Sequence, residues 1–382
     1  MSIVRVLSAL ARPALAGGVL TASAAGGYVA YTQLQASSAT AFQQVRGHGE
    51  RLVVSEFGER SDAIVAIDPK HIASRTTIAT VDHAPGYGIF ATLSPQGDAL
   101  AYTALPPDAP DAGPGAPAQA AVVDDRGKTV LLASDIDLLI PPVWAPDGRS
   151  IVVRKNIPEP HAAGTFELIR LGRDGTRSTI TTWSTAAIFP IAFAPDGSKL
   201  YFATLDARGS DLYSVAPDGS GQTKIAHLSD QITRGWTLSP DGTTLAYSVA
   251  EAGNQPGLVT KTLDLASGAV AVAIPQAQTK AQLSPTWKGD GQLTIGAVKP
   301  SGGGDAVQVQ AAGGAAVPLT RNTASMDVPI AWSPHGDELV VRSVAGTTPF
   351  EAGAARLDLV GADGVRQRVS NSPDTLVVGW LR

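Results

Sequence analysis

Two arginines recur at one position of a repeated phrase in this chain, where they could bind an anion. Arg154 and Arg342 each stand six residues after a turn glycine, whereas other copies of the phrase have small or uncharged residues there. The planar fork of guanidinium donors suits carboxylate and phosphate groups. Because the repeat itself does not require a charge, we predict that these arginines and neighbouring cations hold an anionic group or an acidic partner. The predicted ligand-binding or partner-binding residues are Arg154, Lys155, Arg234, Lys280, Arg321 and Arg342.

A second interpretation of these cations stays open. They would then be ordinary surface residues paired with nearby carboxylates, for which the sequence offers Asp206, Asp230 and Glu251. Surface pairs of this kind contribute little to stability and carry no function.

Other residue types that perform catalysis show no catalytic spacing. The six histidines have no His-Glu-x-x-His pattern, no serine lies in a Gly-x-Ser-x-Gly elbow, and there is no cysteine. We therefore predict no catalytic residue and no cofactor. Carboxylates assembled from distant repeats leave no local pattern, so a divalent metal in a central channel stays open as an alternative.

The elements that must position the cations are short strands joined by a recurring turn. In Ala194-Pro195-Asp196-Gly197, proline presets φ, the aspartate accepts backbone hydrogen bonds, and glycine takes the positive φ of the turn. Alternating apolar residues and a second Gly-containing turn follow in each copy, which indicates four strands per repeat. Repeats of 45 to 51 residues with strand content are typical of propeller blades. The structural turn glycines are Gly97, Gly148, Gly197, Gly242, Gly291 and Gly336.

The two ends of the chain complete one further repeat. His48-Gly49 matches His335-Gly336, and residues 376–380 match the apolar strand that precedes each turn. We predict an all-β, seven-bladed β-propeller over residues 46–382, closed by pairing of the N- and C-terminal strands, which removes two exposed sheet edges. The alternative is a six-bladed propeller with loose terminal strands.

The recurring phrases, such as Leu238-Ser239-Pro240-Asp241-Gly242, resemble the WD40-like, TolB-type (PD40) propeller repeats. The resemblance covers almost all of the chain after residue 46. It implies a β-propeller fold and a role in maintenance of the outer membrane. TolB-like proteins carry an α/β domain before a six-bladed propeller, whereas about 45 residues precede the repeats here.

The N-terminal residues resemble an export signal. Residues 1–12 form a basic n-region with Arg5 and Arg12, and residues 13–34 are uncharged and apolar. This order directs the following chain out of the cytoplasm. Residues 13–34 could be a signal peptide cleaved after Ala22-Ser23-Ala24 or a transmembrane anchor, with residues 35–45 as a linker. We predict an exported chain that is periplasmic or otherwise extracytoplasmic, membrane-anchored or secreted. The alternative is an Ala-rich leader on a cytoplasmic protein.

Charge and loop placement indicate the kind of partner. Acidic residues outnumber basic ones, and no basic run contains aromatic residues, which argues against nucleic-acid binding. Residues 106–118 and 301–304 insert between the second and third strands of their repeats, so both fall on one face. We predict a non-catalytic propeller that binds a protein, a peptide or an envelope component through this face. The alternative is a propeller enzyme, such as a metal-dependent lactonase or other hydrolase, with its site in the channel.

Overall fold

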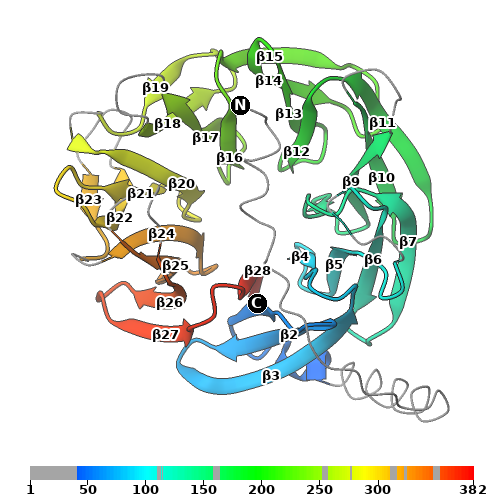
Figure 1. Cartoon of the computed structure of the whole chain (residues 1–382), viewed down its shortest axis with the longest axis horizontal. Coiled ribbons are helices and arrows are strands. Elements are labelled where there is room, and N and C mark those ends of the chain that lie inside the picture. The colour runs from blue at the N-terminus through cyan, green and yellow to red at the C-terminus, as the bar shows by residue number, and fades with distance from the viewer. Residues whose placement is uncertain are drawn as a thin grey trace.

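The computed structural model is an all-β ring (Figure 1). It describes residues 41–109, 113, 115–157, 164–251, 257–275, 278–309, 316–321, 325–346 and 353–382. The predicted n-region, the apolar segment 13–34 and residues 35–40 of the linker lie outside the described residues. Among the residues that are described, no helix has the length and apolar character needed to cross a membrane.

The strands follow the predicted repeats. The first strand of each repeat lies at the centre of the ring and the fourth lies at its rim (Figure 1). In order along the chain the strands are β1 (Arg51–Glu56), β2 (Ser61–Asp68), β3 (His71–Asp82); β4 (Phe90–Leu93), β5 (Ala99–Ala104), β6 (Ala118–Asp124), β7 (Thr129–Ile136); β8 (Val143–Trp144), β9 (Ser150–Ile157), β10 (Thr165–Gly172), β11 (Arg177–Ser184); β12 (Ala187–Phe193), β13 (Leu200–Asp206), β14 (Gly209–Val215), β15 (Thr223–Ser229); β16 (Thr233–Leu238), β17 (Thr244–Glu251), β18 (Gly257–Asp264), β19 (Val270–Val272); β20 (Ala281–Trp287), β21 (Leu293–Val298), β22 (Gly304–Val309), β23 (Ala316–Pro318); β24 (Ser325–Trp332), β25 (Glu338–Ala345), β26 (Ala355–Gly361), β27 (Arg366–Ser370); and β28 (Leu376–Leu381).

The ring closes through its two ends. The last strand, β28, pairs antiparallel with β1, from Arg51 opposite Leu381 to Ser55 opposite Leu376. The resulting sheet has the order β28-β1-β2-β3, so one sheet combines both ends of the described chain. The predicted closure is confirmed, and the alternative with loose terminal strands is wrong.

The propeller fold is confirmed, but neither predicted blade number matches the sheets. Among the described residues, five separate four-stranded sheets form five independent blades. The strands from β20 to β27 form one eight-stranded sheet, because β22 and β24 pair in parallel where Gly304 lies opposite Met326. The prediction of seven separate blades is therefore wrong in its count, and so is the six-bladed alternative.

The turns of neighbouring repeats stack on one another around the ring. Gly242 has a φ of +73°, and a Cβ atom there would lie 2.4 Å from Cδ of Pro195 in the preceding turn. Gly197 likewise faces Pro146 of the turn before it. At Gly197 and Gly242 the phrase therefore serves two purposes, since it shapes the hairpin and lets the turn pack against its neighbour.

The hydrophobic core lies between neighbouring sheets. Val152 and Leu168 of one sheet pack with Ile188 and Phe202 of the next, and all four side chains are fully buried. Packing of the described chain begins at Phe42, which is fully buried against Val53 and other residues of the first two repeats. This core fixes the angular position of every blade, and with it the position of each loop.

Candidate binding surface

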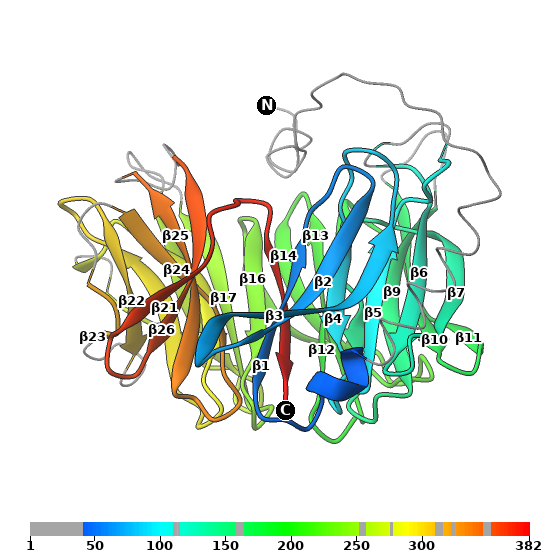
Figure 2. The same ribbon diagram turned by 90° about the horizontal axis from the view of Figure 1, so that it is seen from below.

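The ring has two faces with different loops. The turn face carries the turns between first and second strands and those between third and fourth strands. The loop face carries the connections between second and third strands and those between repeats. Figure 2 shows the ring from the side, with the C-terminal end of β28 on the turn face. The two predicted insertions, near residues 106–118 and 301–304, therefore follow the topology to the loop face.

Arg154 on β9 is a buried structural residue. Its Nε lies 3.0 Å from Oδ2 of Asp137, and its Nη1 donates to the carbonyl oxygen of Ile188 at 2.9 Å. The guanidinium carbon lies 5.1 Å from the ring centre of Phe166 and 5.2 Å from that of Phe189. Because only 7% of the residue is exposed, its charge joins two neighbouring sheets rather than facing solvent.

Arg342 on β25 also makes internal contacts. Its Nη1 and Nη2 donate to the carbonyl oxygens of Pro373 and Thr375, each at 2.7 Å. Burial lowers the pKa of its guanidinium, and Asp374 partly offsets this effect. The side chain therefore fastens the connection between β27 and β28, which carries the chain into the closing strand.

Lys155 on β9 pairs with a carboxylate on β7, the outermost strand of the preceding sheet. Its Nζ contacts Oδ2 of Asp135, whose other oxygen accepts from Nη1 of Arg177 at 2.8 Å. The hydrogen bond from Arg177, with further help from Lys155, lowers the pKa of Asp135 to about 2. Lys155 thus fits the interpretation of an ordinary paired surface cation.

The remaining three predicted cations form an arc on the loop face. Arg234 is the second residue of β16, Lys280 directly precedes β20, and Arg321 lies just before β24. These innermost strands contact one another in succession around the ring (Figure 1). All three residues are exposed, and none has a hydrogen-bond or ion-pair partner for its side chain among the described residues.

The carboxylates proposed as partners for these cations are used elsewhere. Asp206 pairs with Arg208, and Asp230 pairs with His227. The side chain of Glu251 lies outside the described residues. The pairing interpretation is therefore wrong for Asp206 and Asp230. We define the cation arc as Arg234, Lys280 and Arg321.

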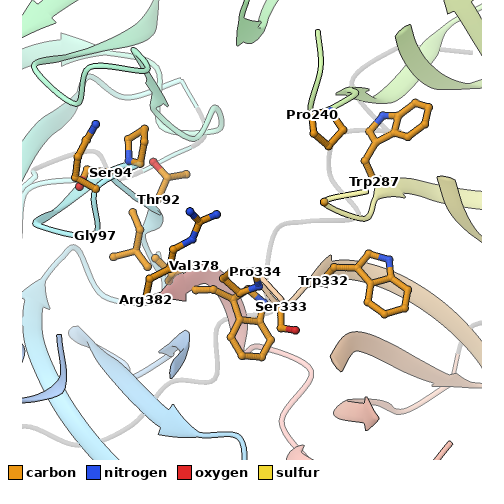
Figure 3. A pocket seen from close by; sticks show the side chains of 16 residues that line it. Thr92, Ser94, Gly97, Pro240, Trp287, Trp332, Ser333, Pro334, Val378 and Arg382 are labelled. Atoms are coloured by element: carbon orange, nitrogen blue, oxygen red, sulfur yellow. The ribbon is translucent and has the colours of Figure 1, made fainter. Parts of the chain in front are cut away.

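A cavity of about 450 Å³ lies at the opposite, turn-face end of the ring centre (Figure 3). Trp287, Trp332 and Arg382 are among its lining residues. The indole nitrogen of Trp287 donates to the carbonyl oxygen of Thr237 at 3.1 Å, and that of Trp332 donates to Oγ1 of Thr294 at 3.0 Å. These rings are therefore engaged with neighbouring strands. No local sequence pattern predicted this cavity, although tryptophan recurs before several of the turns.

One carboxyl group on the turn face has a strongly shifted acidity. Burial, followed by the nearby charges of Asp337 and Glu50, raises the pKa of Glu338 to about 7. Within the described part of the chain, no group of three or more His, Cys, Asp or Glu side chains is arranged to hold a metal ion. The metal alternative therefore has no assembled ligand set among these residues.

Comparison with known proteins identifies a relative that matches only part of the chain. No family model matches the chain. The Tol-Pal system protein TolB of Anaeromyxobacter dehalogenans is 31% identical over 101 residues, which cover 26% of this chain and 22% of the relative. The match thus spans less than a quarter of the curated relative. The predicted resemblance to TolB-type propellers is confirmed over that stretch.

Two enzyme structures resemble most of the ring. An oligogalacturonate lyase from Vibrio parahaemolyticus has a TM-score of 0.54 at 15% identity and covers 78% of this chain and 84% of its own. A candidate 6-phosphogluconolactonase from Bacteroides uniformis has a TM-score of 0.54 at 13% identity, and the match covers 86% of this chain and 96% of the lactonase chain. Likeness at this identity shows the fold alone.

Proposed function

We propose that this TolB-like β-propeller is an exported, non-catalytic binding protein whose loop face recognises acidic groups on a protein, a peptide or an envelope component. The observation that carries the proposal is the cation arc. Arg234, Lys280 and Arg321 occupy the entries to three successive innermost strands, exposed and without side-chain partners among the described residues.

The cations of the arc form no ion pair among the described residues, so their positive charge is available to a partner. The turn face repeats an aspartate in turn after turn, for example Asp196 and Asp241, and the chain as a whole is acidic. An acidic partner is repelled by most of such a surface and attracted to the arc, which favours one docking orientation. Arg154 fastens the β7–β8 connection and Arg342 fastens the β27–β28 connection, and the proposal needs neither arginine to touch the partner.

The proposed location is extracytoplasmic, periplasmic if the cell has two membranes. Arg5 and Arg12 before the apolar residues 13–34 support export. Residues 13–34 act either as a cleaved signal or as a membrane anchor, and no nucleic acid is bound.

The test is affinity capture from membranes of the native cell, read out by mass spectrometry. The full-length chain is compared with a variant carrying R234E, K280E and R321E. We expect specific partners of the unmodified chain to be lost, because the variant replaces three attractive charges by three repulsive ones.

The matched control is R126E, K128E and K199E, which makes the same change of charge on the turn face. These three residues are exposed, and their side chains form no hydrogen bond or ion pair among the described residues. Partners that survive in the loop-face variant and disappear in the control would contradict the proposal.

A second candidate function is an enzyme with its site at the ring centre. The cavity lined by Trp287, Trp332 and Arg382 supports it, together with the lyase and lactonase structures of similar fold. A metal analysis of the purified chain followed by a screen of lactone and ester substrates tests it. Turnover that is abolished by substitutions in the cavity, and unaffected by charge reversal in the arc, would favour the enzyme.

A further inference from the structure

The chain enters the propeller on the turn face. Residues 41–45 form a single helical turn, and Phe42 within it is fully buried among core residues of the first two repeats. Val45 packs partly against the same cluster. Figure 2 shows this helical turn at the same end of the ring as the C-terminal end of β28. A fully buried aromatic side chain fixes the position of the segment that carries it.

Hydrogen bonds hold the next two residues against turns of the same face. Arg46 forms an ion pair with Asp125 in the turn between β6 and β7, and its Nη2 lies 3.5 Å from the carbonyl oxygen of Gln96. Gly47 donates its backbone N–H to the carbonyl oxygen of Arg382 at 3.1 Å. The entry point is thus fastened to the second repeat and to the end of the closing strand.

The distance from this entry point to the apolar segment 13–34 is limited by covalent geometry. The seven steps from residue 34 to residue 41 reach at most about 25 Å when fully extended. Strand β2, which runs from the loop face to the turn face beside the entry point, has 8 residues and spans about 26 Å. The headgroup layer of a bilayer adds about 5 Å. Contact of the loop face with the membrane would therefore need more than about 30 Å.

We propose that residues 13–34 remain attached as a membrane anchor and hold the propeller with its turn face toward the bilayer and its loop face away from it. This inference rests on the anchored form of the proposed function. A link of this length cannot bring the loop face onto the same membrane.

The proposed orientation of the propeller on the membrane determines from which side a partner can reach the cation arc. The cation arc points away from the membrane that holds the chain, so its acidic partner is a soluble component or one presented from an opposing surface. Headgroups of the chain's own membrane lie beside the turn face, where the repeated aspartates stand. Lipid of that membrane is therefore not the ligand of the arc.

The absence of cysteine allows a direct test with single-cysteine variants of the full-length chain in liposomes. Lys199 precedes β13 on the turn face and Arg208 follows it on the loop face, and both residues are exposed. A fluorophore attached at K199C or R208C reports energy transfer to acceptor-labelled lipid headgroups. We expect at least a twofold higher transfer efficiency from position 199.

A lengthened link supplies the control. Inserting about 30 Gly and Ser residues between Thr40 and Ala41 adds a flexible spacer with a mean reach of about 30 Å, and we expect the difference between the two positions to shrink. Equal or higher transfer from position 208 in the unmodified chain overturns the proposed orientation. If the intact mass of protein recovered from native membranes lacks residues 13–34, the segment is cleaved and the anchor is overturned. The mass therefore distinguishes failure of the anchor from failure of the proposed orientation.

Discussion

The repeat position of Arg154 suggests a binding residue, whereas its surroundings show a buried structural residue. Arg154 places a charge at a repeat position where Arg342 is the other charged copy, yet Asp137, Ile188 and two phenylalanine rings enclose it. Removing one member of a buried ion pair leaves the charge of the other member without its partner. The functional value of Arg154 therefore lies in holding two sheets together.

Replacement of Arg154 by methionine is expected to lower the free energy of unfolding by about 3 kcal/mol, because the carboxylate of Asp137, whose side chain is only 11% exposed, loses its ion-pair partner. Urea denaturation monitored by circular dichroism measures the change. The double variant R154M/D137L should regain part of the loss. R321M, at an exposed position, should change stability by less than about 0.5 kcal/mol. An equal effect of R154M and R321M would contradict the structural role.

Glu338 should make stability depend on pH. Its pKa is raised from 4.5 in an unfolded chain to about 7 by burial and by neighbouring carboxylates, so the folded state favours the protonated form. The stability that it contributes is complete below pH 4.5 and is lost as the pH rises to about 7. Because the group stays partly accessible to solvent, we expect the loss to be about 1 kcal/mol.

The variant E338Q isolates this effect. Glutamine stays neutral, so the difference in unfolding free energy between the two proteins should grow in favour of E338Q from pH 5 to pH 8. Denaturation curves at four pH values measure it. A difference that does not change with pH would show that Glu338 titrates normally.

The turn between first and second strands is the element that repeats most faithfully. Its strand-turn-strand structure was predictable because proline, aspartate and glycine each act on their own backbone or on the next few residues. The stacking of Pro195 on Gly242 was not predictable, since it joins residues of two repeats. The same holds for the parallel contact between Gly304 and Met326, which merges two sheets and made the predicted blade count wrong.

The Gly242→Ala variant tests the double role of the turn glycine. Gly268 has a similar φ of +72°, but a Cβ atom there would meet nothing within 4 Å. G268A should therefore lower the free energy of unfolding by about 1 kcal/mol, which is the strain of an alanine in the left-handed region. G242A should cost at least about 1 kcal/mol more, because its methyl group meets Pro195. Equal losses in thermal or urea unfolding would rule out the stacking contribution.

At the scale of the whole molecule, the ring separates two surfaces of different chemistry. The sequence was sufficient to predict the propeller, its closure through β28 and β1, and the face that carries the insertions. It could not separate the six predicted cations into two groups. Arg154, Lys155 and Arg342 contact residues distant in the sequence. Arg234, Lys280 and Arg321 have no such side-chain partner in the part of the chain that the structure describes. That distinction depends on neighbouring repeats, which no local pattern encodes.

The central claim is that the loop face contacts the partner. The most direct test attaches a photo-activated cross-linker to a single cysteine at Gln231, an exposed loop-face residue near Arg234, or at Lys199 on the turn face. Each labelled chain is irradiated in membranes of the native cell, and cross-linked products are identified by mass spectrometry. We predict a specific adduct from position 231 that is lost in the R234E/K280E/R321E background, and none from position 199. A specific adduct from position 199 alone would contradict the account.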